Sequence, residues 1–304
     1  MRALANPGPG TPTRRPLGSS LVVTALACVA LLFSGAVRAE PALWVVKSEH
    51  ATVYLFGTIH VLRADVAWKT PKIQKAFDDS QSLTLEIVDV GDKQAAVTLI
   101  QKYGLDLAHP LSGQLTDDEN SKLNAAYVAL GMPPKAFDAF APWFAGVTFS
   151  VLPLVKQGYD PNAGVDVLLK QAAQARKEPI DAFETSEQQV QYFANMPKAE
   201  QLTLLDEALR DYPDTVKHLD ELAKDWMRGD VDAIAKSLND DISKDDPALY
   251  DLLLTRRNVA FADQIATKLK GSGVSFIAIG AAHLAGPDSV QVQLAKHGFK
   301  AERL

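Results

Sequence analysis

The sequence is almost free of cysteine. Its single cysteine, Cys28, lies within the first 39 residues, so a chain that begins at Glu40 contains no thiol. Such a chain forms no disulfide and uses neither a cysteine nucleophile nor a thiolate metal ligand. Any catalytic or metal site in it must therefore be built from His, carboxylate, Arg or hydroxyl side chains.

Basic residues are also outnumbered. The chain has 31 Lys and Arg against 37 Asp and Glu, and four of the arginines but none of the acids precede residue 40. The rest of the chain thus has 27 basic and 37 acidic residues, a net charge of −10. A surface of this charge repels phosphate backbones and anionic lipid, and no basic stripe with interleaved aromatic residues is present. We therefore expect no nucleic-acid partner.

A long apolar run is missing as well. The run from Leu21 to Phe33 has 13 residues, fewer than the roughly 20 that a helix needs to span a bilayer. It follows Arg14 and Arg15 and precedes small residues that end at Ala39, which is the pattern of an export signal. We expect residues 1–39 to be a signal peptide that is cleaved after Ala39. The remaining chain would be periplasmic or secreted and would have no membrane span.

Two other interpretations of this leader are weaker. The pair Arg14–Arg15 is also typical of twin-arginine signals, but the usual following phenylalanine is absent. Cys28 would be the modified residue of a lipoprotein, but Ala25 stands where a leucine is expected. A general export signal is therefore favoured over twin-arginine export and over lipidation.

Strand patterns lie toward both ends of the remaining chain, and helical patterns fill its middle. Runs rich in β-branched and aromatic residues predict strands at 42–47, 51–56, 82–90, 178–183, 273–280 and 299–304. We predict a single α/β domain over residues 40–304, with α+β as the alternative. Its mixed central sheet would be flanked by helices and interrupted by a helical insertion at about 105–230.

Two segments of the helical middle carry specific sequence signals. Thr116 followed by Glu119 forms a capping box, which predicts a helix that starts there. Residues 140–155 are the most apolar stretch after the leader, and their length and prolines disfavour a membrane span. We interpret this stretch as a buried helix, with a cover over an active site or a partner surface as the alternative.

A glycine-x-x-histidine pattern occurs twice at the end of a predicted strand. The pairs are Gly57 with His60 and Gly280 with His283. With 18 glycines and six histidines in 304 residues, chance gives roughly 0.4 such spacings, so the repeat favours a shared role. Glycine permits a sharp turn or a close approach, and α/β proteins place ligands at the carboxyl ends of strands. A lone histidine there would more often be a hydrogen-bonded core residue.

Glu86 is the third candidate, because it stands in the apolar run 82–90. An ionised glutamate in a central strand requires a cation or a metal as a partner, whereas on a solvated face it requires neither. Two imidazoles and a carboxylate form a ligand set that suits Mn, Co, Zn or Fe and leaves positions open for water. The sequence has no HExxH motif, which excludes a zincin-type protease at the level of motifs.

These residues stand in segments that resemble a known family. The stretches "LFGTIHVL", "TLEI", "GVDVLL", "IDAFET", "RRN" and "AIGAAHLAGPDSV" are similar to the TraB/GumN family over about residues 43–303. That family is related to the Tiki metalloproteases and, more distantly, to erythromycin-esterase-like and ChaN-like proteins. The resemblance implies a mixed sheet with surrounding helices, a site at the strand ends and, for the Tiki branch, metal-dependent peptide hydrolysis.

The resemblance also assigns residues. The family pattern of two glycine-x-x-histidine motifs, a glutamate and an arginine falls on His60, His283, Glu86 and Arg257. Arg257 would pair with Glu86 or stabilise an oxyanion, and a surface salt bridge is the alternative. The secondary candidates are Gly57, Gly280, Asn258, Asp166 and Glu184. For Asp166 and Glu184 we favour structural roles, early in a helix and as a helix cap.

The leading hypothesis is therefore an exported metal-dependent hydrolase, most simply a peptidase acting on a peptide or protein. His60, His283 and Glu86 would hold a divalent metal, while Glu86 and Arg257 would be catalytic, Glu86 as ligand or general base. The alternative is a periplasmic protein that binds a peptide, haem or metal without turnover, for which Tyr54 and residues 140–155 are weak haem candidates. Nothing in the sequence favours one oligomeric state over another.

Overall fold

The computed structural model describes residues 40–240, 243–244 and 246–304. The predicted signal peptide and its cleavage after Ala39 lie outside these residues and stay predictions, and so does the expectation that Cys28 is not lipidated. Among the described residues, no helix combines the length and the apolar character that crossing a membrane requires.

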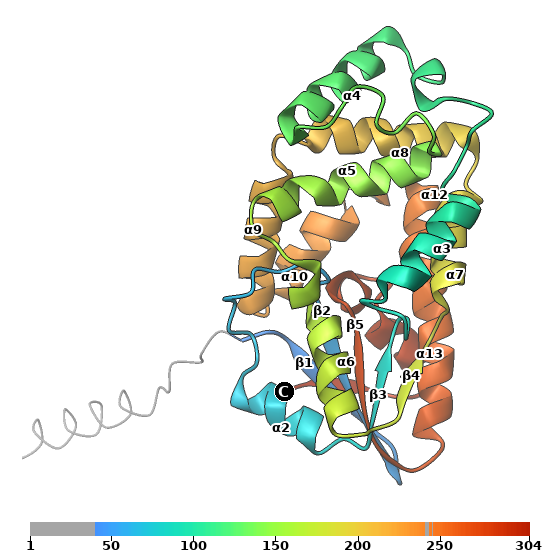
Figure 1. Ribbon diagram of the computed structural model, residues 1–304. Coiled ribbons are helices and arrows are strands. Elements are labelled where there is room, and N and C mark those ends of the chain that lie inside the picture. The colour runs from blue at the N-terminus through green and yellow to red at the C-terminus, as the bar shows by residue number, and fades with distance from the viewer. Residues whose placement is uncertain (1–39, 241–242, 245) are drawn as a thin grey trace, which may run out of the picture. The chain divides into compact units, whose positions relative to one another are not determined.

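Six strands form one mixed sheet whose order is β4-β3-β5-β2-β1-β6. The strands are β1 Leu43–Lys47, β2 Ala51–Thr58, β3 Ser82–Leu85, β4 Ile180–Ala182, β5 Gly273–Gly280 and β6 Ala301–Arg303. β1 is antiparallel to both β2 and β6, whereas β2, β5, β3 and β4 run parallel to one another. The prediction of a mixed sheet built from both ends of the chain and flanked by helices is confirmed (Figure 1).

The parallel strands set the position of the site. Strand β5 lies between β2 and β3, and Thr58 at the end of β2 is in register with Gly280 at the end of β5. The carboxyl ends of three neighbouring strands therefore meet at one edge of the sheet. In Figure 1 that edge faces the helices α3, α5 and α7.

Helices surround the sheet and extend beyond its site edge. The longer helices are α2 Pro71–Asp78, α3 Lys93–Tyr103, α4 Asp117–Leu130, α5 Pro142–Lys156, α6 Val165–Ala175, α7 Ser186–Ala194, α8 Lys198–Asp211, α9 Thr215–Met227, α13 Arg256–Leu269 and α14 Val290–Lys296. Short helical segments complete the set: η1 Leu111–Gly113, η2 Pro161–Ala163, α10 Val231–Ile234, η3 Ala235–Asp240, α12 Pro247–Tyr250, η4 Asp251–Thr255 and η5 Ala281–Leu284.

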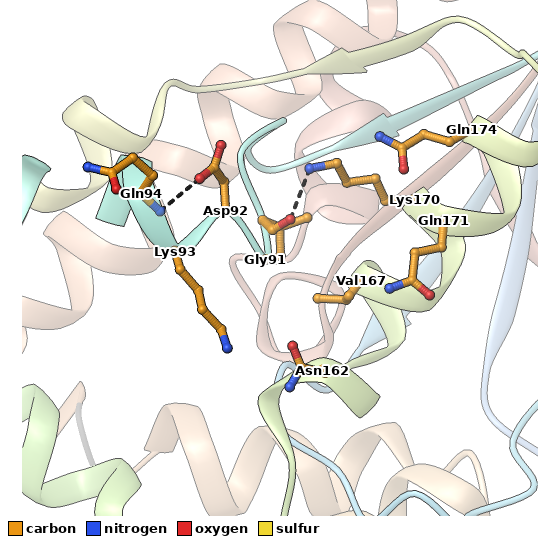
Figure 2. Close-up of a pocket in the computed structure, with 10 residues that line it drawn as sticks. Gly91, Asp92, Lys93, Gln94, Asn162, Val167, Lys170, Gln171 and Gln174 are labelled. Carbon is orange, nitrogen blue, oxygen red and sulfur yellow. Dashed lines mark hydrogen bonds between the residues drawn. The ribbon is translucent and has the colours of Figure 1, made fainter. Parts of the chain in front are cut away.

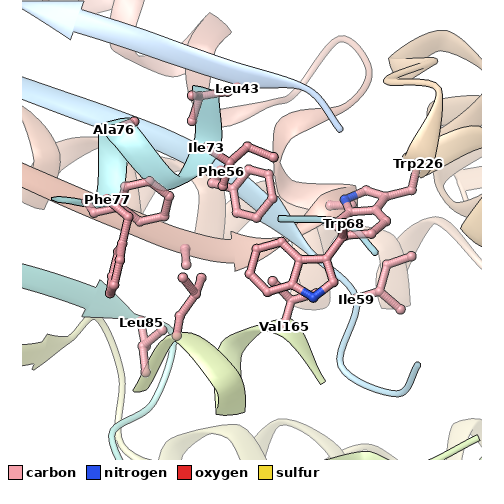
Figure 3. Packing of buried hydrophobic residues seen from close by; sticks show 14 of the residues in the cluster. Leu43, Phe56, Ile59, Trp68, Ile73, Ala76, Phe77, Leu85, Val165 and Trp226 are labelled. Atoms are coloured by element: carbon pink, nitrogen blue, oxygen red, sulfur yellow. The ribbon is translucent and has the colours of Figure 1, made fainter. Parts of the chain in front are cut away.

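Each face of the sheet has its own core, because side chains of a strand alternate between the two faces. On one face, Phe276 and Ala278 pack with helices α2 and α6, as Figure 3 shows for Phe77 and Val165. On the other face, Ile277 and Ile279 of the same strand pack with residues of α13 and α14. Strand β5 is therefore apolar on both faces, which explains its nearly continuous hydrophobic sequence.

A third apolar cluster joins α4, α5 and α8 away from the sheet. Its residues include Ala145 and Phe149, which are fully buried on one side of α5. The interpretation of residues 140–155 as a buried helix is therefore correct for that side. The capping box at Thr116 and Glu119 is present at the start of α4, as the sequence predicts.

One predicted strand boundary differs from the structure. The strand predicted at 82–90 ends at Leu85, and the chain then turns before Gly91, whose φ is 82°. Ile87 and Val90 are apolar because they line a groove rather than because they continue the strand. In addition, the helical stretch that leads into α13 contains a π-helical turn, η4, immediately before it.

Trp226 of α9 fixes the end of β2 from one side. Its ring is buried against Phe56 and Trp68 in the cluster of Figure 3, and its indole N–H donates to the carbonyl oxygen of Gly57 at 2.8 Å. A buried carbonyl that loses its donor costs about 1–3 kcal/mol.

We expect Trp226→Phe to lower the free energy of unfolding by about 1–3 kcal/mol, because the Gly57 carbonyl would lose its buried partner. Urea denaturation followed by circular dichroism measures this change. Val128→Ala on α4 is the control, since Val128 is 81% exposed and its truncation should stay within about 0.5 kcal/mol. An unchanged midpoint for Trp226→Phe would contradict the assigned role.

Candidate active site at the strand ends

The three main candidates lie at the carboxyl ends of three neighbouring strands. His60 follows β2, Glu86 directly follows β3, and His283 lies in η5 directly after β5. The Nε2 atoms of His60 and His283 both lie 3.8 Å from the same oxygen, Oε1 of Glu86. Residues more than 200 positions apart in the sequence therefore face one carboxylate.

Each glycine of the repeated motif allows close packing against residues of the other half of the site. A Cβ on Gly57 would lie 3.1 Å from Cα of Ala281, so Gly57 allows η5 to pack on the end of β2. A Cβ on Gly280 would lie 3.1 Å from Oε1 of Glu86 and 3.2 Å from Nε2 of His60. Glycine is needed at both positions for close approach, and neither has a positive φ.

Glu86 is buried and fully engaged as a hydrogen-bond acceptor. Its Oε1 accepts from the backbone N–H of Gly280 at 2.6 Å, and its Oε2 accepts from Arg257 Nη2 at 2.6 Å. Burial acts to raise the pKa of Glu86, but its electrostatic interactions with His283, His60 and Arg257 and the hydrogen bond from the Gly280 N–H outweigh it. The pKa of Glu86 therefore lies well below its usual range, and the carboxylate is ionised.

Arg257 connects Glu86 to Glu184 in a buried cluster. Its Nε and Nη2 donate to the two oxygens of Glu184 at 2.9 and 2.8 Å, and its side chain is only 10% exposed. The alternative of a surface salt bridge is therefore wrong for Arg257. Glu184 does not cap α7 either, because Thr185 is the N-cap residue and forms a capping box with Gln188.

Each imidazole is oriented by an oxygen on its Nδ1 atom. His60 Nδ1 lies 3.1 Å from Oδ1 of Asp166, which is in the first turn of α6, and His283 Nδ1 lies 2.6 Å from Oδ1 of Asn258. These acceptors favour a proton on Nδ1, so Nε2 is directed toward Glu86. Asp166 thus contacts the candidate site in addition to its place in the helix.

The two histidines differ in charge. The side chain of His60 is 57% exposed, so the loss of water contact lowers its pKa only weakly; the hydrogen bond and charge of Asp166 and the charge of Glu86 raise this pKa to about 9. His283 is buried, and desolvation lowers its pKa to about 4 despite the nearby Glu86. At neutral pH, His283 is therefore a neutral imidazole whose Nε2 accepts a hydrogen bond from Arg257 Nη1 at 3.1 Å.

Two contributors were not predicted from the sequence. Gln189 Nε2 donates to Glu86 and to Glu184, both at 3.1 Å, and the hydroxyl of Tyr192 donates to Glu184 at 2.9 Å. Both lie on α7, three residues apart and therefore on one helix face. Their closeness in sequence to Glu184 was the only available signal, and it is weak without a structure.

The candidate site is the floor of a groove. A cavity of about 800 Å³ lies over His60, Glu86 and Asp166, and its walls come from α3, α5 and α7. One side of α5 lines this groove, so part of residues 140–155 also covers the candidate site. Sites of this size that are apolar apart from a few polar groups are typical of ligand-binding clefts.

Comparison with known proteins agrees with this arrangement. The model of the TraB/PrgY/gumN family matches residues 42–303, which is most of the chain and includes every residue of the candidate site. The chain belongs to the TraB/PrgY/gumN family. The family resemblance expected from the sequence motifs is thereby confirmed.

Three similar proteins of this family have names that assign no activity. YbaP of Escherichia coli K12 is 24% identical over 257 residues, covering 84% of this chain and 92% of YbaP, and YbaP of Shigella flexneri gives the same values. A protein of Treponema pallidum is 24% identical over 292 residues, covering 89% of this chain and 86% of its own. All three are named as uncharacterized proteins. No solved structure matches the chain.

The donor types in this TraB/PrgY/gumN site fit a divalent metal ion. Imidazoles with Nδ1 bonded to an oxygen and Nε2 directed at a carboxylate are the usual arrangement of metal-binding histidines. The 3.8 Å separations exceed the roughly 3–3.5 Å between atoms that share an ion with bonds near 2.1 Å. Within the described residues, no group of three or more His, Cys, Asp or Glu side chains lies close enough together to hold a metal ion as it stands. Ion binding would require a small contraction and release of His283 Nε2 by Arg257.

Arg257→Ala should lower the free energy of unfolding by about 3–5 kcal/mol, because it leaves two buried carboxylates without their cation. Arg256→Ala is a matched control one residue away. Its side chain is 72% exposed and pairs only with Asp251 among the described residues, so its loss should cost about 1 kcal/mol or less. Equal effects of the two substitutions in urea denaturation would show that the buried cluster does not stabilise the fold.

Proposed function

We propose that this protein is an exported metal-dependent hydrolase that cleaves peptide bonds. The observation that carries the proposal is the convergence of two oriented imidazoles on one oxygen of an ionised, buried glutamate. His60, His283 and Glu86 would hold one divalent ion, with Mn, Co, Zn and Fe all compatible with such donors. The peptide substrate is inferred from the resemblance to the Tiki metalloproteases, and export from the N-terminal sequence pattern.

The surrounding residues have separate roles in this proposal. A bound divalent ion would polarise the scissile carbonyl as a Lewis acid. Asp166 and Asn258 hold the imidazoles so that Nε2 faces the floor of the groove. Because its pKa lies well below the usual range, Glu86 is a weak base, and we assign it the role of a ligand rather than of the general base.

Arg257 would stabilise negative charge that develops on the substrate. Its guanidinium is fixed by Glu184 and by the carbonyl oxygen of Leu253, to which Nη1 donates at 3.0 Å. The same Nη1 group also donates to His283 Nε2. When His283 serves as a ligand, this N–H becomes available for an oxyanion, and donors that are positioned in advance contribute strongly to catalysis.

A binding protein without turnover is the second candidate, and the large apolar groove above the site favours it. Such a protein would sequester a peptide or a metal with the same residues. A haem role is less well supported, because Tyr54 packs toward Phe276 in the sheet core and is not among the residues that line the groove.

We expect the purified protein to bind about one divalent ion and to cleave peptides, and a chelator should abolish cleavage. His60→Ala and His283→Ala should each lower the metal content and reduce kcat/KM by roughly 10²-fold or more, because each removes a ligand. His297→Ala, which breaks only a surface pair with Asp263, is the control and should retain both properties.

Metal analysis, with cleavage assays of a broad peptide library, separates the outcomes. Stoichiometric metal that both variants lose, with no peptide cleaved by the unsubstituted protein, would favour the binding role. If the protein binds no metal and both variants are merely destabilised, the metal site itself is wrong.

Gly280→Ala tests the site with a single methyl group. The new Cβ would lie 3.1 Å from Glu86 Oε1 and 3.2 Å from His60 Nε2, so it would separate the donors. The neighbouring groups must then shift by a few tenths of an ångström, so we expect kcat/KM to fall by about tenfold while the protein stays folded. Gly113→Ala is the control, because its Cβ would meet no atom within 4 Å. Full activity in Gly280→Ala, measured with the same peptides, would contradict the proposed geometry.

A further inference from the structure

Helix α3 leaves an apolar face that the rest of the described chain does not bury. None of its residues is buried, although Ala95, Ala96, Leu99 and Ile100 line the groove together. The helix is attached near its end, where Lys102 and the hydroxyl of Tyr103 contact Glu187 of α7, the latter by a short hydrogen bond. A helix normally packs its apolar face against a core, so this uncovered face indicates a surface that receives a ligand.

The opposite wall of the groove is apolar as well. Val147, Val151 and Val155 follow one another at four-residue spacing on α5, and all three line the cavity. The other side of α5 is buried in the cluster with α4 and α8. Helix α5 therefore presents two apolar sides, one to the core and one to the groove.

A polar arm continues from this apolar part (Figure 2). It is a second cavity of about 560 Å³ between the loop at Gly91–Gln94 and one side of α6. The α6 residues that line it are Val167, Lys170, Gln171 and Gln174, and Asn162 lies below them in Figure 2. The side-chain amides of Gln171, Gln174 and Asn162 both donate and accept hydrogen bonds, which matches the alternating N–H and C=O groups of a peptide backbone.

The two cavities adjoin each other, because they share lining residues that include Val90, Lys93 and Asn162. The charged groups of the apolar part select against anions. Among the described residues, two cationic groups line it, Lys93 and the protonated His60, against five carboxylates: Glu86, Asp89, Asp92, Asp160 and Asp166. A fatty acid or phospholipid headgroup would meet repulsion there, whereas a neutral or basic peptide would not.

We infer that the groove takes an extended peptide that places a bulky apolar side chain between α3 and α5 and polar, uncharged or basic residues in the arm along α6. This inference rests on the proposed function, since the scissile bond would lie over His60 and Glu86 on the floor of the apolar part. Cleavage adds water across the C–N bond: a C–O bond forms, the C–N bond breaks and the leaving nitrogen takes a proton. No redox partner is required.

The test uses internally quenched octapeptides of Gly, Ser, Asn and Lys that differ only in one central residue, which is Leu, Ser or Asp. We expect the purified protein, loaded with its divalent ion, to cleave the Leu peptide with a kcat/KM about tenfold or more above that of the Ser peptide. The Asp peptide should be the poorest substrate. Equal kcat/KM for the three peptides would overturn the inference.

Two substitutions on α3 separate the groove from general effects on the helix. Leu99→Asp places a charge in the groove and should remove the preference for Leu over Ser, whereas Val97→Asp should keep it, because Val97 is 45% exposed and does not line the groove. Should Leu99→Asp fail to fold in circular dichroism, Ala96→Asp replaces it, since Ala96 is exposed and lines the groove. A preference that survives the groove substitution would contradict the inference.

A binding measurement distinguishes failure of this inference from failure of the proposed function. If no peptide is cleaved, fluorescence anisotropy of the labelled Leu and Ser peptides decides between them. Leu-specific binding that Leu99→Asp weakens about tenfold and Val97→Asp does not would support the groove and reject only the hydrolase. No binding of either peptide, or tight binding of dansyl-undecanoate in their place, would overturn the groove assignment.

Discussion

The buried contact of one guanidinium with two carboxylates determines the arrangement of the site. Arg257 comes from α13, Glu86 from the end of β3 and Glu184 from the segment after β4, so a single cation joins three parts of the chain. Two buried carboxylates that contact the same guanidinium would repel each other without it. Glu86 can accept from the Gly280 N–H and face both histidines because Arg257 compensates its charge. The ion cluster is thus a condition for the site, whichever ligand the site binds.

Sequence patterns located the carboxyl ends of the two strands that carry the glycine-x-x-histidine motifs. Both glycine-x-x-histidine motifs follow strands that turn out to be parallel neighbours in register, and this geometry explains why the pattern occurs twice. The sheet composition and the helix starts were also predictable, because strand runs, capping residues and prolines act locally. The assignment of Glu86 to a strand interior was wrong, since Ile87 and Val90 owe their apolar character to the groove. Apolar periodicity shows that a residue is covered but does not identify what covers it.

The parts that sequence could not predict depend on contacts between distant segments. Gln189 and Tyr192 are ordinary helix residues until α7 is placed beside Glu86 and Glu184. The structural roles favoured for Asp166 and Glu184 followed from their positions near helix starts, where such residues often cap or face the dipole. In the structure, Asp166 reaches His60 and Glu184 reaches Arg257, so tertiary contacts override those local tendencies. The two facing apolar walls likewise appear only when α3 and α5 are brought together.

The π-helical turn η4, Asp251–Thr255, sets the angular phase of the helix that carries Arg257 and Asn258. An α-helix advances about 100° per residue, and a π-turn closes its hydrogen bond one residue later than an α-turn does. The carbonyl of Leu253, inside that turn, accepts from Arg257 itself. Loss of one residue from this turn would rotate α13, with Arg257 and Asn258, relative to the helix that precedes the turn. The side chains of the site would be chemically unchanged. The geometry of the site therefore depends on the number of residues between Tyr250 and Arg256 as well as on the identity of its side chains.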